Sequence, residues 1–191
     1  MKPPHMNRPA QAGSSLITVL VAILLLSLGM LALGAMLSFS VQMPKLSGYR
    51  ATAVNLASSY IERMRANPGG SLGGFNNGDY EKPSNYDGEF NDIPLVPCIY
   101  PACNEISLAA MDLADTQRAV RFELPAGGIL MVRDGNVALN ATNVGNLWIV
   151  WQEPSTYAVL NPSSSDNCPD QITTNPDFNP RPRCLYVRFK I

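Results

Sequence analysis

The hydrophobic positions divide the chain into two unlike parts. Residues 16–39 form a run of 24 that is apolar apart from Thr18, two serines and two glycines. A helix rises about 1.5 Å per residue, so this run spans roughly 36 Å, enough to cross the hydrocarbon core of a bilayer. A cleaved secretory signal has a shorter apolar region, and a buried core helix rarely stays apolar on every face. A membrane-spanning anchor is therefore the interpretation that fits.

A helical period of three to four resumes after Pro44. The apolar residues that share one face are Leu46, Tyr49, Ala53, Leu56, Tyr60 and Met64. We expect Pro44 to kink this helix rather than end it, and Asn67 to end it in a left-handed conformation, because Pro68 cannot continue it. The pattern predicts one helix of about 50 residues whose amphipathic second half lies against a globular domain.

The pattern over the rest of the chain predicts a small domain that contains both helix and strands. Residues 67–107 are crowded with Gly, Asn, Asp and Pro, which is typical of irregular structure. A second helix is predicted over residues 108–122, with Met111, Ala114, Arg118 and Phe122 on one face. Three strand-like stretches follow, and they read GILMVRD, NLWIVWQ and CLYVRFKI. An antiparallel sheet with a helix packed on it, an α+β fold, is the expected architecture.

The four cysteines all follow the apolar run. They are Cys98, Cys103, Cys168 and Cys184. An even number suits disulfides in an oxidising compartment, whereas the paired C-x₂-C spacing of many zinc sites is missing. Four cysteines allow three pairings, and we favour the local one, 98 with 103 and 168 with 184, because each bond closes a short proline-containing loop. The cysteines place the later domain in the periplasm or outside the cell, since the lysines and arginines flanking the run barely discriminate its orientation.

Composition and charge limit the partners and the reactions that can be expected of this chain. The net charge is −1 and no block of basic residues occurs, so nucleic acid is not an expected partner. The only histidine, His5, precedes the apolar run, so the later domain has no Ser–His, Cys–His or His–metal pair. The acidic stretch DYEKPSNYDGEFND lacks the ligand spacing of an EF-hand, and the pattern at 140–142 is a glycosylation sequon by chance. We expect no enzyme activity, no metal and no cofactor.

Aromatic residues near the second strand have two interpretations. Trp148, Trp151 and Tyr157 could form a binding surface, but their place in or beside a strand favours packing in the core. Small residues in the apolar run are similarly ambiguous. Gly29, Ala32, Gly34 and Ala35 would permit close helix packing, or a membrane helix simply tolerates them.

The motifs at the N-terminus and beyond carry a family resemblance. A short basic leader ending in Gly13 and followed by SSLITVLVAILLLSLGML resembles the N-terminus of type IV pilins and pseudopilins. The segments GYRATAVNLASSYIERMRANPGG, LAAMDLADTQRAVRFELPAGG, LWIVWQE and CLYVRFKI are similar to PilV-type minor pilins of type IV pili. The resemblance implies a pilin-like fold, cleavage by prepilin peptidase between Gly13 and Ser14, and N-methylation of Ser14. It divides the chain into a leader (1–13), a transmembrane and assembly half-helix (14–43), an amphipathic half-helix (44–66) and an exported globular domain (67–191).

Two residues depart from the family pattern. The mature chain would begin with Ser14 where the family usually has Phe, and Thr18 stands where the family usually has Glu. In pilins that Glu is thought to pair with the N-terminal ammonium of a neighbouring subunit. A threonine removes both the pairing charge and the cost of burying it in the membrane. Our hypothesis is a subunit at or near a fibre tip.

The function implied is that of a minor pilin in pilus assembly, supporting pilus biogenesis, adhesion or motility. Expected partners are other minor and major pilins, prepilin peptidase, the inner-membrane assembly platform and the lipid bilayer. The protein would reside in the inner membrane before assembly and in the extracellular pilus afterwards. Two alternatives stay open: a minor pseudopilin of type II secretion, and a membrane-anchored exported binding module or enzyme.

Overall fold

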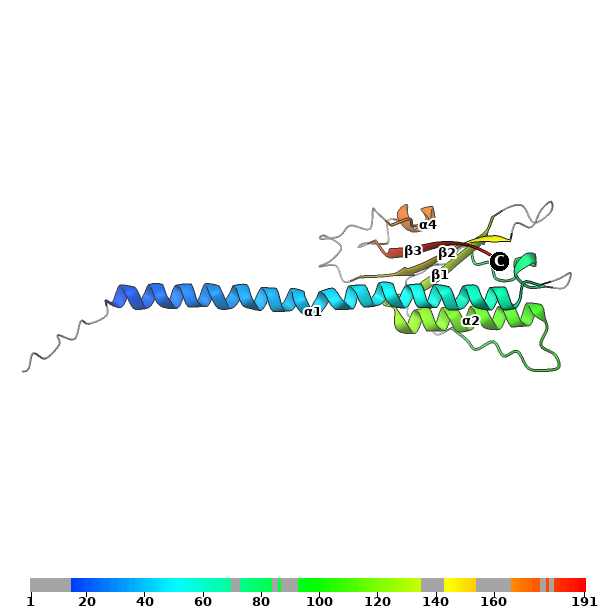
Figure 1. Cartoon of the computed structure of the whole chain (residues 1–191), viewed down its shortest axis with the longest axis horizontal. Helices are drawn as coiled ribbons and strands as arrows, with labels where there is room; N and C mark the ends of the chain where they lie inside the picture. The colour runs from blue at the N-terminus through cyan, green and yellow to red at the C-terminus, as the bar shows by residue number, and fades with distance from the viewer. Residues whose placement is uncertain are drawn as a thin grey trace, which may run out of the picture. The chain divides into compact units, whose positions relative to one another are not determined.

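The computed structural model describes residues 15–69, 73–83, 86, 93–134, 143–153, 166–175, 178 and 181–191. The elements in chain order are α1 (Leu16–Ala66), η1 (Phe75–Asn77), α2 (Glu105–Glu123), β1 (Gly128–Arg133), β2 (Val144–Trp151), α4 (Asp170–Thr173) and β3 (Arg183–Lys190), as drawn in Figure 1. The chain forms two compact units, Met1–Lys45 and Leu46–Ile191, and α1 belongs to both. The predicted α+β class is confirmed.

The first half of α1 has no protein around it. Every residue between 16 and 45 whose burial is described is exposed, although most of them are apolar. Two of its hydroxyls bond back to the helix: Thr18 Oγ1 donates to the carbonyl of Ser15 at 2.6 Å, and Ser27 Oγ to the carbonyl of Leu24 at 2.8 Å. A hydroxyl satisfied in this way costs little in an apolar medium. The helix continues through Pro44, so the prediction of one long helix is confirmed, at 51 residues.

The second half of α1 supplies one wall of the core of unit Leu46–Ile191. Its fully or nearly fully buried residues are Ala53, Ala57, Tyr60, Ile61 and Met64, and Tyr49 and Leu56 pack beside them. These residues recur every three or four positions, as one face of a helix requires. The amphipathic pattern therefore identified the correct packing face.

The end of α1 differs from the prediction in its mechanism. The helix stops at Ala66, as expected, but Asn67 has no positive φ; the first positive φ after the helix belongs to Gly69, at 80°. Asn67 is 5% exposed, and its side-chain amide donates to Tyr80 Oη at 3.1 Å and to the carbonyl of Glu105 at 2.9 Å. Asn67 thus serves as a buried cross-link between elements, and the left-handed stop is wrong.

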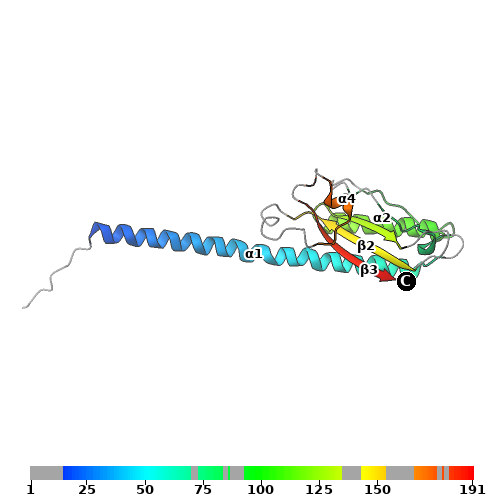
Figure 2. The ribbon, with the colours of Figure 1, turned by 90° about the horizontal axis from the view of Figure 1, so that it is seen from above.

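The three strands form one antiparallel sheet in the order β1-β2-β3. Leu130 lies opposite Trp148, which lies opposite Tyr186, and this register places the alternating side chains of all three strands on common faces. All three predicted strands are confirmed. In Figure 1 the sheet lies between α4 on one side and the layer of α1 and α2 on the other, and Figure 2 shows the three strands from above.

The two faces of the sheet bury different clusters. The face toward α1 and α2 contributes Ile129, Met131, Leu147, Ile149, Trp151 and Phe189 to the main core. The opposite face contributes Leu130, Val150 and Cys184 to a smaller cluster that α4 closes with Ile172. Both faces of this short sheet are therefore covered, at least in part.

Helix α2 begins earlier and faces the core differently than predicted. Asn104 caps it in a capping box: Asn104 Oδ1 accepts from the backbone N–H of Ser107, and Ser107 Oγ accepts from that of Asn104, both at 2.8 Å. Its buried residues are Ala109, Asp112, Ala114, Thr116 and Val120. The predicted face is wrong at its end, because Phe122 is 92% exposed and Arg118 is also exposed. Polar residues occupy core positions here, and the apolar pattern cannot reveal them.

Candidate anchoring and assembly surfaces

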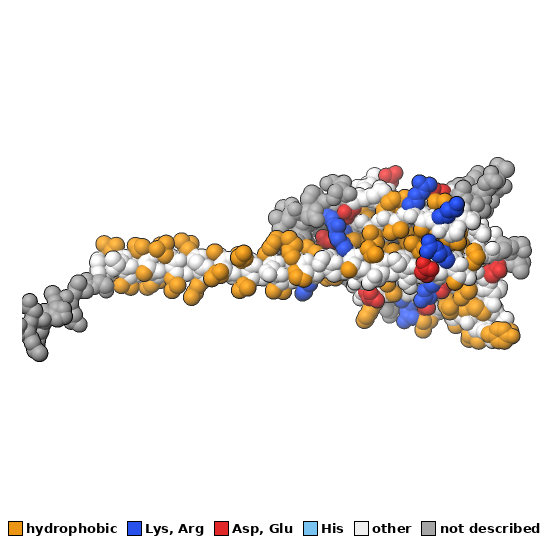
Figure 3. All heavy atoms as spheres, in the orientation of Figure 1, with side chains coloured by type: hydrophobic (Ala, Val, Ile, Leu, Met, Phe, Trp, Pro, Cys, Tyr) orange, Lys and Arg blue, Asp and Glu red, His pale blue; other side chains and the backbone are white. Residues whose placement is uncertain are grey.

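The exposed apolar half of α1 is the largest candidate surface. By length and composition α1 can cross a membrane, and the apolar stretch that qualifies it is not buried at all. Hydrophobic side chains surround this part of the helix on the visible face (Figure 3). Water is an unfavourable environment for so much apolar area, so the surface requires lipid or other apolar helices around it.

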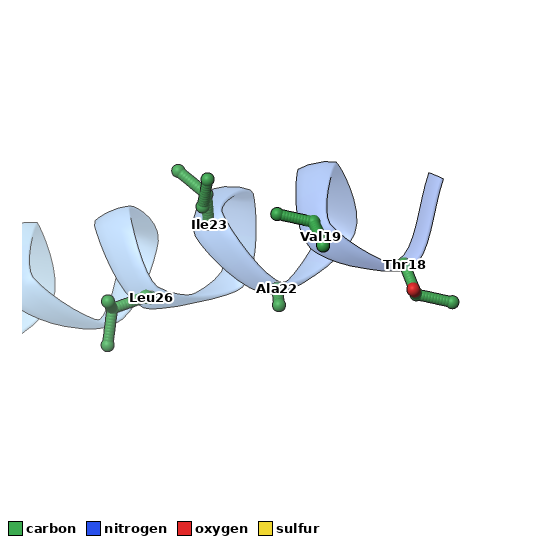
Figure 4. Close-up of a pocket in the computed structure, with 5 residues that line it drawn as sticks. All are labelled: Thr18, Val19, Ala22, Ile23 and Leu26. Atoms are coloured by element: carbon green, nitrogen blue, oxygen red, sulfur yellow. The ribbon is translucent and has the colours of Figure 1, made fainter. Parts of the chain in front are cut away.

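Thr18 lies near the start of this surface. It lines a shallow open hollow with Val19, Ala22, Ile23 and Leu26, shown in Figure 4. Ala22 has the shortest side chain of the five and leaves the hollow between its neighbours. Thr18 donates its hydroxyl proton to Ser15, so toward any neighbouring chain the oxygen can act only as an acceptor. An acceptor without charge can receive a hydrogen bond from an ammonium but cannot form an ion pair with it.

The glycines of the same stretch have open space beside them. A methyl group added at Gly29 or Gly34 would meet no atom within 4 Å, so neither glycine is required by a contact inside the chain. This is compatible with close approach of another helix, and equally with a membrane helix that simply tolerates glycine.

The predicted cleavage and methylation residues, Gly13 and Ser14, lie outside the described residues.

Two disulfides fix the loops of unit Leu46–Ile191. They join Cys98 to Cys103 and Cys168 to Cys184, the local pairing favoured from the sequence. The second bond has 16 residues of sequence separation and attaches the segment before α4 to the buried start of β3. The first closes a loop within residues 93–103, which carry no charge and expose Leu95, Ile99 and Tyr100.

A buried polar cluster, absent from the sequence predictions, joins α1 to α2. Asp112 is 5% exposed; its Oδ1 accepts from Arg63 at 2.9 Å and its Oδ2 from Tyr80 Oη at 2.8 Å. Tyr80 in turn accepts from Asn67, and Tyr60 Oη donates to the carbonyl of Tyr80 at 3.1 Å. Burial raises the pKa of the Tyr80 phenol well above its usual value near 10, and the hydrogen bond to Asp112 raises that pKa further. The cluster determines the orientation of α2 against α1.

A second buried ion cluster lies beside the Cys168–Cys184 bond. Arg183 is 2% exposed and forms an ion pair with Asp166 at 2.8 Å between Nε and Oδ2. Its Nη2 donates a hydrogen bond to Asp166 Oδ1 at 3.0 Å. Asp166 also accepts from the backbone N–H of Cys184 at 3.2 Å. Arg50 of α1 lies 4.0 Å from the same carboxylate. Paired and hydrogen-bonded in this way, the buried charges hold the C-terminal loop in one position.

The aromatic residues of β2 serve packing. Trp151 is 2% exposed in the main core. Trp148 is half-buried, its ring lies 5.2 Å from that of Tyr186, and its Nε1 donates to the carbonyl of Asn167 at 2.8 Å. The prediction that these aromatic residues pack in the core is confirmed for Trp151, and Tyr157 lies outside the described residues.

The acidic stretch has partners of its own. Asp79 accepts from the backbone N–H of Gly74 at 2.7 Å, and Glu81 accepts from Arg133 Nε at 2.9 Å. Much of the remaining stretch, together with His5 and Asn140, lies outside the described residues. Across the part of the chain that the structure describes, no group of three or more His, Cys, Asp or Glu could hold a metal ion.

No family model, no curated protein and no solved structure matches this chain. The architecture itself is nevertheless pilin-like: a long N-terminal apolar helix contacts a small antiparallel sheet. The exposed apolar helix and the two disulfides together indicate a membrane-anchored or exported protein.

Proposed function

We propose that this protein is a minor pilin, held in the inner membrane by α1 before assembly and built into a type IV pilus through the same helix. One observation carries the proposal: a single helix has an apolar half with no cover and a second half that is part of a folded core. A plain anchor needs about 20 apolar residues, whereas this helix extends from the apolar run into the core without a break. The same helix therefore supplies both the apolar segment and one wall of the folded core.

Assembly would exchange the lipid contacts of α1 for contacts with other helices. In the membrane the exposed side chains contact lipid, and in a fibre they contact α1 of other major and minor pilins. Since lipid is as apolar as leucine, the exchange depends on close packing and polar matching rather than on a hydrophobic drive. Prepilin peptidase would remove residues 1–13, and the inner-membrane assembly platform would move the subunit into the fibre. The protein supports pilus biogenesis, and through it adhesion or motility.

Cell fractionation tests the assignment. Cells that produce the full chain are sheared, and the fibre fraction, the inner membrane and the periplasm are probed separately. The proposal expects the protein in the first two fractions. Protein found only in the soluble periplasm, or lost secretion of exoproteins with normal pili after deletion of the gene, argues against it.

Thr18 supports a more specific position at or near the fibre tip. A tip subunit has no preceding subunit whose ammonium must be matched, and Thr18 offers only an uncharged acceptor there. The variant Thr18→Glu restores a carboxylate, and Thr18→Gln is its uncharged control of equal size. We expect Glu, and not Gln, to redistribute the protein along the fibre or to change pilus number. Unchanged tip localisation and pilus number with Glu contradict the tip position.

A further inference from the structure

Strand β3 leaves one edge of the sheet open. It is an outer strand in the order β1-β2-β3, and no strand among the described residues pairs with its other side. The N–H of Ile191 donates to the carbonyl of Asn143, just before β2, at 2.7 Å. Residues of an antiparallel strand bond to their partner alternately, so this bond fixes the pattern for all of β3. The odd-numbered residues bond to β2, and the even-numbered ones direct their N–H and C=O groups to the open edge.

Side chains of the same unit occupy both ends of this edge. The N–H of Cys184 donates to Asp166 Oδ2 at 3.2 Å, and the carbonyl of Lys190 accepts from Arg65 at 3.3 Å. Both residues of β3 are even-numbered, so the two bonds agree with the alternation. They also limit the open part of the edge to the residues between them.

The middle of the edge carries unpaired backbone groups. In the part of the chain that the structure describes, the N–H and C=O of Tyr186 and Arg188 have no hydrogen-bond partner. Tyr186 is half-buried and Arg188 is exposed, so an approaching chain can reach them. An open edge of this kind accepts an extended peptide as an added strand, because main-chain hydrogen bonds supply the affinity.

A groove of about 450 Å³ lies between the second half of α1 and the end of β3. Figure 2 shows the two elements running side by side there. Ile61 and Phe189 line the groove and are each 7% exposed, and Val187 is half-buried beside them. Glu62 and Arg65 also line it and form an ion pair at 2.6 Å, so their charges compensate. The groove therefore suits apolar side chains.

The opposite face of β3 carries positive charge. Val187 and Phe189 lie on the face toward α1, so Arg188 and Lys190 lie on the other face. Both cations are exposed; Arg188 is paired with Asp134, and the ammonium of Lys190 has no carboxylate partner among the described residues. Opposite charges on neighbouring strands attract each other. An added strand with acidic side chains at alternate positions therefore fits this face.

The charges also decide which kind of chain fits. A second copy that paired its own β3 here would bring Arg188 and Lys190 of both copies together, and like charges on adjacent strands repel. We propose that the open edge of β3 binds an extended acidic segment of another protein as a fourth strand. Alternate apolar side chains of that segment lie in the groove, and its acidic side chains lie beside Arg188 and Lys190. Every residue of this site belongs to unit Leu46–Ile191, so the site is independent of the proposed pilus function.

Binding of the labelled peptide VEVEVEV to the full chain in mild detergent tests this site, with fluorescence polarisation as the measurement. At about 0.15 M salt we expect saturable binding. Lys190→Glu should weaken it about tenfold, because an attraction becomes a repulsion. Arg118→Glu makes the same charge reversal at an exposed position of α2 and should leave the affinity unchanged. No saturable binding by the parent chain, or an equal loss in both variants, overturns the proposal.

Two N-methylated forms of the peptide test the strand geometry without any change in the protein. The N–H groups of alternate residues in a strand point to the same edge, so methylating the valine amides blocks one edge and methylating the glutamate amides blocks the other. We expect one form to lose binding and the other to retain it, and equal affinities of the two forms overturn strand addition. A dimer of the free chain in analytical ultracentrifugation that the peptide dissociates shows a second copy on the edge, which also overturns the proposal.

Discussion

Asp112 is the residue whose removal should destabilise unit Leu46–Ile191 most clearly. Its carboxylate accepts the Tyr80 hydroxyl proton at 2.8 Å and lies 2.9 Å from Arg63. In Asp112→Ala the buried Tyr80 hydroxyl loses a charged acceptor, which costs about 1.5–3 kcal/mol. Arg63 loses less, roughly 0–1 kcal/mol, because 39% of its side chain is exposed and Asp115 lies 3.8 Å away. We expect a loss of about 3 kcal/mol in the free energy of unfolding.

Urea unfolding in mild detergent, followed by the fluorescence of buried Trp151, measures this loss. Asp112→Asn keeps an oxygen that can accept from Tyr80, so its expected cost is only about 1 kcal/mol. Asp115→Ala removes a half-exposed carboxylate from the same helix and should change stability by less than about 0.5 kcal/mol. A loss under about 1 kcal/mol for Asp112→Ala, or an equal loss for Asp115→Ala, refutes the reasoning about the buried cluster.

Three other perturbations test different parts of the fold. The folded state raises the pKa of Tyr80 above its unfolded value near 10, so above pH 10 the folded protein retains a proton that the unfolded chain releases. The free energy of unfolding should therefore fall as the pH rises above 10. Urea midpoints should show a less steep fall in Tyr80→Phe. Replacing Cys168 and Cys184 by serine should cost about 3 kcal/mol, measured against the reduced and oxidised parent, and a cost near zero contradicts the clamping of the C-terminal loop. Gly127→Ala would place a methyl group 2.1 Å from a backbone carbonyl of α2 and should lower stability by about 1–3 kcal/mol, whereas an unchanged melting temperature argues against that close approach.

Periodicity predicted the elements that bury a regular apolar face. The spacing from Ala53 to Met64 gave the packed face of α1, and β-branched and aromatic runs gave all three strands. Such predictions succeed where one side of an element is apolar throughout, because burial then follows directly from the pattern. The short helices η1 and α4, with three and four residues, are too brief to show any period.

The predictions failed where polar residues occupy the core. Asp112 and Thr116 lie on the buried face of α2, whereas the apolar pattern included the exposed Phe122 in the predicted packing face. Asn67 suited a helix stop by type, yet its amide is used by Tyr80 and Glu105, which lie distant in sequence. Hydrogen-bond partners of this kind are determined by the tertiary fold, and the local spacing of residues does not reveal them.

The mature N-terminus, read by mass spectrometry on protein taken from membranes and from sheared fibres, tests the central claim most directly. If α1 is both anchor and assembly helix of a pilin-like subunit, the chain should begin at Ser14, and its first residue should carry an added methyl group. An intact Met1, or a chain cut beyond Phe39 with the apolar run removed, contradicts the account.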